Sequence, residues 1–187
     1  MEKSLERVWY YDTEIGRVGI AENGNAITEI TLLKTCLGPG ITRLLDPEIK
    51  EETPLSPVGA GITRPIKEET QLLKTAAEQL KEYLAGNRQT FDLPLDPRGT
   101  EFQKSVWNAL LDIPFGEIRS YKQVAEAIGN PKACRAVGMA NNKNPILIVI
   151  PCHRVIGSNG SLVGYGGGID LKENLLKLEG FEVKKKD

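Results

Sequence analysis

The sequence predicts an α+β protein with two parts, a small sheet with one helix followed by a mostly helical part. Alternating apolar and polar residues, interrupted by an Asn-Gly turn, fill the first 34 residues and are typical of antiparallel strands. Helical spacing of apolar residues begins near residue 67 and returns in four segments after residue 98. A proline-containing linker at 91–97 separates the two patterns, so we expect domains at 1–97 and 98–187.

The first part begins with three expected strands, and Asn23-Gly24-Asn25 supplies a hairpin turn between the second and the third. These strands are expected at 8–11, 16–21 and 26–32. Residues 36–66 contain five prolines and no sustained periodicity, which indicates a long loop. A helix is expected over 67–84 and ends at Gly86.

The second part opens with a helix that Thr100 caps. The residues expected on its buried face are Phe102, Val106, Trp107, Leu110 and Leu111. The apolar run at 146–150 is expected to be a strand, and a glycine-rich loop at 157–168 surrounds Tyr165. A last helix is expected over 170–178, and Glu179-Gly180 closes it.

Two short helices in the middle of this part are typical of a helix-turn-helix. Ser120 caps the first helix at 121–128, and a Gly-Asn-Pro turn leads into the second at 132–140. The second helix is built from small residues, with Arg135 as the long side chain in its middle. Small residues let a helix approach a groove closely, but they also mark tight packing in a core, and both interpretations stay open on this evidence.

Cys152 stands directly beside His153, the only histidine in the chain. A thiol reacts as thiolate, and a free cysteine with a pKa near ~8.5 needs a base or a positive field to ionise at neutral pH. His153 is the candidate base. Neighbouring residues on a strand point to opposite faces, so a direct hydrogen bond between them requires a turn or a bridging water. The alternative is that Cys152 is a buried apolar residue that ends the strand and that His153 lies on the surface.

Composition narrows the class of protein. No apolar run approaches the ~20 residues that span a bilayer, and the N-terminus lacks a signal-peptide core, so we expect a cytoplasmic protein. The three cysteines form no CxxC pair, and we therefore expect no disulfides. A zinc site is not expected, because one histidine and three scattered cysteines lack the usual ligand spacing. The net charge of −1 combines −5 over 1–97 with +4 over 98–187. The basic excess at 119–154 either meets phosphates or is a solvated face.

The motifs PCHRVIG, NPILIVI, GYGGG, SYKQVAEAIGNPKACRAVG and KLEG, in their order along 98–180, resemble the O6-alkylguanine-DNA alkyltransferase (methylated-DNA–protein-cysteine methyltransferase) family. The resemblance implies a ribonuclease-H-like N-terminal domain and a winged-helix-like C-terminal domain. It implies DNA repair by single-turnover transfer of an alkyl group from O6-alkylguanine, and more weakly from O4-alkylthymine, to a cysteine of the protein. The expected partner is double-stranded DNA that contains the lesion, and a monomer without cofactor or metal is expected.

The same resemblance assigns roles to the residues that match the family motifs. Cys152 would accept the alkyl group, with His153 acting as base through a water and Glu179 orienting the imidazole. Asn144 would hydrogen-bond within this network and fix a turn, and Tyr121 would give a proton or hydrogen bond to the departing guanine.

The remaining assignments concern DNA and the base. Arg135 would fill the place of a nucleotide that is rotated out of the duplex, from a helix that enters the minor groove and carries the small residues Ala136 and Gly138. The backbone of Val155 and the Tyr165-Gly166 loop would line the guanine pocket. Two alternatives remain, a non-catalytic sensor of alkylated DNA and a cysteine hydrolase with multiple turnovers.

Overall fold

The computed structural model describes residues 6–33 and 65–181, and its first part is a four-stranded sheet covered by a helix. The strands are β1 (Arg7–Thr13), β2 (Gly16–Glu22), β3 (Ile27–Leu32) and β4 (Ile66–Lys67), in the order β3-β2-β1-β4. The three predicted strands are confirmed, and β1/β2 and β2/β3 are antiparallel. The sheet also has a fourth strand that was not predicted, β4, which pairs with β1 in parallel. Two residues are too few to show a period in the sequence.

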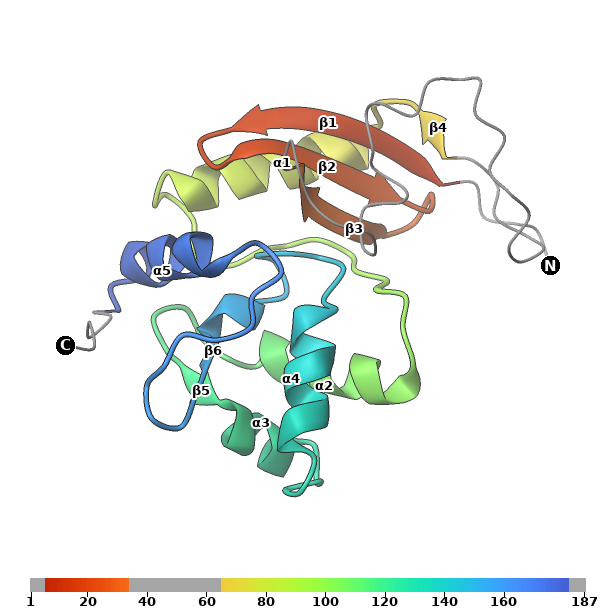
Figure 1. The fold of residues 1–187 in the computed structure, drawn as a ribbon. Helices are drawn as coiled ribbons and strands as arrows, with labels where there is room; N and C mark the ends of the chain where they lie inside the picture. The colour runs from red at the N-terminus through yellow and green to blue at the C-terminus, as the bar shows by residue number, and fades with distance from the viewer. Residues whose placement is uncertain (1–5, 34–64, 182–187) are drawn as a thin grey trace.

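Helix α1 (Gln71–Leu84) packs its apolar face against this sheet (Figure 1). The Thr70 side chain accepts a hydrogen bond from the amide of Leu73, which fixes the start of the helix. The helix therefore begins four residues later than predicted, because Ile66–Lys67 is engaged in β4. The predicted loop at 36–66 and Cys36 fall almost entirely outside the described residues.

The second part contains the predicted helices (Figure 1). Its elements are α2 (Glu101–Leu111), β5 (Arg119–Ser120), α3 (Tyr121–Ala127), α4 (Cys134–Asn142), the 3₁₀ turn η1 (Cys152–Arg154), β6 (Val155–Ile156) and α5 (Ile169–Leu178). Thr100 and Ser120 cap α2 and α3, each in a capping box with a glutamine three residues later. Leu111 does not belong to the buried face of α2 as predicted. Leu111 is 44% exposed, because it is the last residue of the helix and faces solvent.

The strand predicted at 146–150 is wrong, and two tight turns replace it. The amide of Val149 donates to the carbonyl of Leu147 at 2.9 Å, across Ile148 with φ of 72°. The amide of Cys152 donates to the carbonyl of Ile150 at 2.7 Å, across Pro151. Both are γ-turns, which reverse the chain over three residues. The apolar run reflects burial in the core, and periodicity does not distinguish a buried turn from a buried strand.

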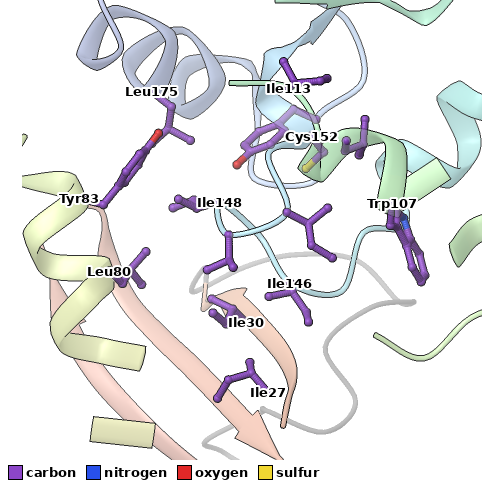
Figure 2. Packing of buried hydrophobic residues seen from close by; sticks show 14 of the residues in the cluster. Ile27, Ile30, Leu80, Tyr83, Trp107, Ile113, Ile146, Ile148, Cys152 and Leu175 are labelled. Atoms are coloured by element: carbon purple, nitrogen blue, oxygen red, sulfur yellow. The ribbon is translucent and has the colours of Figure 1, made fainter. Parts of the chain in front are cut away.

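The two parts share one hydrophobic core (Figure 2). The outer edge of β3 is paired by the second part, since the amide of Ile30 donates to Pro145 and the amide of Leu147 donates back to Ile30. Ile27 and Ile30 of the sheet therefore lie in the same cluster as Ile146 and Cys152. Within the described residues, no helix is long and apolar enough to cross a membrane.

Candidate active site

Cys152 and His153 lie on the 3₁₀ turn η1, and both side chains are fully buried. The alternative that placed His153 on the surface is therefore wrong. The turn that the Cys-His pair requires is present, because Pro151 sits at the corner of the preceding γ-turn. The imidazole Nδ1 is buried and has no hydrogen-bond partner among the described residues, so no direct bond joins it to the sulfur. A bridging water stays a prediction for this atom.

Asn144 provides a polar contact to the sulfur of Cys152. Its Nδ2 donates to the Sγ atom at 3.0 Å and to the carbonyl of Ile150 at 2.8 Å, and its Oδ1 accepts the amide of Ile146 at 3.0 Å. Asn144 therefore fixes the two γ-turns and the sulfur together. Burial raises the pKa of the Cys152 thiol to about 11, and the Asn144 hydrogen bond and the charge of Lys172 oppose that shift.

His153 is paired with Glu179 on its other nitrogen. Nε2 of the imidazole lies 2.9 Å from Oε1 of Glu179. Because the carboxylate only accepts, this contact places the imidazole hydrogen on Nε2 and leaves Nδ1 as the unprotonated nitrogen. Burial lowers the pKa of His153, although Glu179 acts in the opposite direction. The neutral imidazole is therefore the form that this site favours.

Glu179 is positioned by the way α5 ends. It is the C-cap of the helix, and Gly180 follows with φ of 83°. The amide of Gly180 donates to Lys177 and the amide of Phe181 donates to Leu176, which together form a Schellman motif. The Glu-Gly pair noted in the sequence therefore fixes the direction in which the carboxylate leaves the helix.

Arg154 binds the same carboxylate. Its Nε lies 2.9 Å from Oε2 and its Nη2 lies 2.9 Å from Oε1 of Glu179, while Nη1 donates to the carbonyl of Ile113 at 2.6 Å. Burial raises the pKa of Glu179, but the hydrogen bonds from His153 and Arg154 outweigh it and lower the pKa to about 2. The carboxylate is therefore ionised at neutral pH.

Lys172 is a buried cation that the sequence interpretation missed. Its side chain is completely buried, and Nζ donates to the carbonyls of Val155 at 2.5 Å and Val163 at 3.0 Å. Burial lowers its pKa to about 8. The signal was present, because Leu171, Lys172, Leu175 and Leu176 share the spacing of one helix face.

Tyr121 and Lys172 donate hydrogen bonds to the same carbonyl oxygen. The Tyr121 hydroxyl donates to the carbonyl of Val163 at 2.8 Å, the same oxygen that Lys172 binds. Burial raises the pKa of Tyr121 to about 12, so the hydroxyl keeps its proton. Helices α3 and α5 therefore hold the glycine-rich loop from two sides.

The residues expected to line a base pocket lie in β6 and in the glycine-rich loop that follows it. Val155 is fully buried, Tyr165 is 7% exposed, and Gly166 is exposed. The Tyr165 ring lies edge-on to the ring of His153, with centroids 6.4 Å apart, and its hydroxyl is buried without a partner among residues 6–33 and 65–181. Tyr165 and Val155 therefore belong to the cluster around Cys152.

The residues predicted to contact DNA form a second group on α4. Arg135 and Ala136 are exposed, whereas Val137 and Ala140 are buried against the core. Gly138 faces the Tyr121 ring, since a Cβ built there would lie 3.8 Å from it. Val137 and Ala140 therefore pack α4 on the core, as the packing interpretation required, and the side of the helix opposite Val137 presents Arg135 to solvent.

Comparison with known proteins agrees over both parts. The family model described as 6-O-methylguanine DNA methyltransferase, ribonuclease-like domain, matches residues 7–97, and the DNA binding domain of the same family matches residues 101–181. A methylated-DNA–protein-cysteine methyltransferase of Methanosarcina acetivorans is 61% identical over 113 residues, which cover 60% of this chain and 72% of that protein.

Two longer matches come from mycobacteria. A methylated-DNA–protein-cysteine methyltransferase of Mycobacterium bovis is 44% identical over 168 residues, 90% of this chain and 88% of that protein. The crystal structure of Mycobacterium tuberculosis OGT in complex with DNA is 41% identical and superposes with a TM-score of 0.72 over 93% of this chain and 91% of that chain. A match of this identity over nine-tenths of the chain, with both family models in sequence order, assigns this protein to the 6-O-methylguanine DNA methyltransferase family.

Proposed function

We propose that this protein repairs DNA by transferring the methyl or a larger alkyl group from the O6 atom of guanine to Cys152. The observation that carries the proposal is the buried Cys152 sulfur, which accepts a hydrogen bond from Asn144 beside an imidazole whose Nδ1 has no partner within residues 6–33 and 65–181. Membership of the family and the relatives named methylated-DNA–protein-cysteine methyltransferase support it. The protein has one domain at 1–97 and a second at 98–187, and the residues matched by the two family models support this division.

The transfer is a displacement at the alkyl carbon. The Cys152 sulfur forms a bond to that carbon, the bond between the carbon and O6 breaks, and its electron pair stays on the guanine. The thiol proton leaves as the new bond forms, and the guanine anion gains a proton. The products are a thioether on the protein and an unmodified guanine in DNA. A thioether is not readily cleaved, so each molecule reacts once and needs no cofactor.

The proton of the thiol requires a base. With a pKa of about 11, roughly one molecule in ten thousand carries the thiolate at pH 7. His153 Nδ1 receives the proton through a bridging water, and the ionised Glu179 stabilises the imidazolium that forms. Asn144 adds a donor to the sulfur, which favours the thiolate over the thiol.

The departing guanine is met by Tyr121 and by the residues around the glycine-rich loop. Burial keeps the Tyr121 hydroxyl protonated, as a hydrogen-bond donor to the base must be. The hydroxyl now donates to Val163, so it must exchange this carbonyl for the base. Val155, Tyr165 and Gly166 line the pocket. Since Cys152 is fully buried, the side chains that cover it must shift before the base reaches the sulfur.

Access to the O6 atom requires that the nucleotide leaves the duplex, at a cost of a few kcal/mol. Arg135 on the exposed face of α4 fills the space that it leaves. Ala136 adds little bulk to this exposed face, which suits the narrow minor groove and contacts to phosphates and sugars, while Gly138 lets the Tyr121 ring approach the helix from α3. The partner is double-stranded DNA bound by a monomer, and O4-alkylthymine is a weaker substrate. The cytoplasmic location expected from the sequence stays a prediction.

The test is the mass of the intact protein after incubation with duplex DNA containing O6-methylguanine. We expect a gain of ~14 Da, one methyl group in place of a proton, and peptide mapping should locate it on Cys152. Cys152→Ala removes the gain and keeps DNA binding, whereas the matched variant Cys134→Ala keeps both. Binding without a mass gain in the wild type supports a lesion sensor instead, and lesion loss without an adduct supports a hydrolytic enzyme.

A further inference from the structure

Tyr83 brings the first part of the chain into the site. It lies in the last turn of α1, is completely buried, and extends toward Leu175 of α5 (Figure 2). Its hydroxyl is 2.5 Å from Oε1 of Glu179 and 3.2 Å from Nε2 of His153. Glu179 Oε1 is the same atom that the imidazole contacts at 2.9 Å. The three groups therefore form a closed triangle of polar atoms.

The protons in this triangle have one consistent arrangement. Glu179 has a pKa of about 2 and only accepts, while burial raises the pKa of Tyr83 and keeps the phenol protonated. The phenol hydrogen therefore points to Oε1, and its oxygen lone pair faces Nε2 of His153. An Nε2–H group fits between these two acceptors. An unprotonated Nε2 would instead face the oxygens of Tyr83 and Glu179 with its lone pair. Neither could donate to it, because the phenol hydrogen already points to Oε1.

The position of the hydroxyl is set by packing on α1 and not by the second part alone. The Tyr83 ring lies 5.3 Å from the ring of Phe91 and 6.2 Å from that of Phe115, between centroids. Leu80, one turn earlier on the helix, is also fully buried. A ring held on several sides keeps its hydroxyl in place without further hydrogen bonds.

We propose that Tyr83 is a positioning residue that reinforces the Nε2–H tautomer of His153, because its hydroxyl orients the shared oxygen of Glu179 and is a second acceptor beside Nε2. Nδ1 is then the nitrogen left to take the proton of Cys152, and α1 supplies part of the reactive geometry from the other half of the chain. The consequence for transfer rests on the function proposed above. The assignment of the tautomer does not rest on that function, because it follows from contacts inside the protein.

The competing interpretation is an ordinary buried tyrosine that has found a carboxylate for its hydroxyl. In that case Tyr83→Phe lowers stability but leaves the imidazole unchanged, since Glu179 remains beside Nε2. A readout of the imidazole itself separates the two interpretations.

The experiment is ¹⁵N NMR of the imidazole, which gives a single set of signals because His153 is the only histidine in the chain. We expect the wild type without DNA to show the Nε2–H tautomer, and Tyr83→Phe to show a mixture of both tautomers. Methyl transfer by Tyr83→Phe should be about tenfold slower or more, the effect of one lost hydrogen bond to an ionised carboxylate. Tyr11→Phe is the matched control, because it removes a hydroxyl from β1, where Lys81 covers the ring, and it should change neither signal nor rate.

An unchanged tautomer in a folded Tyr83→Phe protein would overturn the proposal, even if the variant is less stable. An Nδ1–H tautomer in the wild type would overturn it without any variant. The spectra contain no DNA, so they decide the role of Tyr83 independently of whether a methyl group reaches Cys152. A wild type that fails to transfer methyl contradicts the proposed function and not the tautomer.

Discussion

The Nδ2 atom of Asn144 lies 3.0 Å from the sulfur of Cys152, and the same nitrogen holds the carbonyl of Ile150. A single amide therefore links the nucleophile to the turn that presents it. The sulfur is buried, and burial alone favours the neutral thiol. The donor on Asn144 offsets part of that penalty, so geometry and reactivity depend on the same side chain.

Replacing Asn144 with alanine should slow methyl transfer at neutral pH. The sulfur loses a donor that favours the thiolate, and each unit of increase in the thiol pKa lowers the thiolate fraction about tenfold. Single-turnover rates with duplex DNA containing O6-methylguanine measure the effect, and DNA affinity should not change. Asn142→Ala, an exposed amide on the same helix end, is the control. Equal rates for both variants would show that the contact with the sulfur does not matter.

Stability should fall in acid because of Glu179. Its pKa is about 2 in the folded protein against an ordinary value of 4.5 for the carboxyl group, so the unfolded chain binds more protons between these values. The stabilisation is present above pH 4.5 and is lost as the pH falls toward 2, by roughly 3 kcal/mol. His153, whose pKa is also lowered, acts in the same direction below its ordinary value of 6.5.

Urea unfolding of the wild type and Glu179→Gln between pH 7 and pH 3 measures this effect. We expect the variant to be less stable at pH 7 and to show a shallower decrease in acid. Glu126→Gln, at a carboxylate that is 50% exposed, should keep the slope of the wild type. A slope in Glu179→Gln equal to that of the wild type would mean that other groups cause the acid loss.

Gly180→Ala should reduce both stability and transfer. The φ of 83° costs a residue with a Cβ about 1 kcal/mol, although no atom lies within 4 Å of the added carbon. Gly129→Ala is closely matched, with φ of 73° at the end of α3 and equally open space. We expect similar losses in melting temperature for the two variants and slower transfer for Gly180→Ala alone, because Glu179 precedes Gly180. Slower transfer in both would point to a general effect of stability.

Arg135→Ala should weaken repair of duplex DNA much more than reaction with free O6-methylguanine. The arginine acts only when a nucleotide has left a stacked duplex, and the free base has no stack to leave. Transfer rates on both substrates give the comparison. Arg88→Ala removes the same charge from the first part of the chain, where Arg88 pairs with Glu82, and should affect neither substrate. An equal loss on both substrates in Arg135→Ala would contradict the proposed role.

The ends of several helices could be predicted from the sequence, because they depend on residues that are close together in the chain. Thr100 and Ser120 fix the starts of α2 and α3, and Gly180 ends α5, because caps act through hydrogen bonds within a few residues. The proposed nucleophile and base, Cys152 and His153, could be predicted for the same reason, because they are adjacent in the sequence. These predictions rest on local chemistry.

Only the tertiary structure decided what surrounds that pair. Tyr83 lies 70 residues before His153 and shows no local sign of its role, and the γ-turns of 146–152 share their apolar composition with a buried strand. The helix spacing places Lys172 on the apolar face of α5, but only the fold shows that the carbonyls of Val155 and Val163 are its partners. The physical reason is that burial and long-range hydrogen bonds depend on which segments meet in the core. The sequence by itself determined the capped ends of α2, α3 and α5 and pointed to the Cys-His pair, and packing decided where α1 begins and how that pair is oriented.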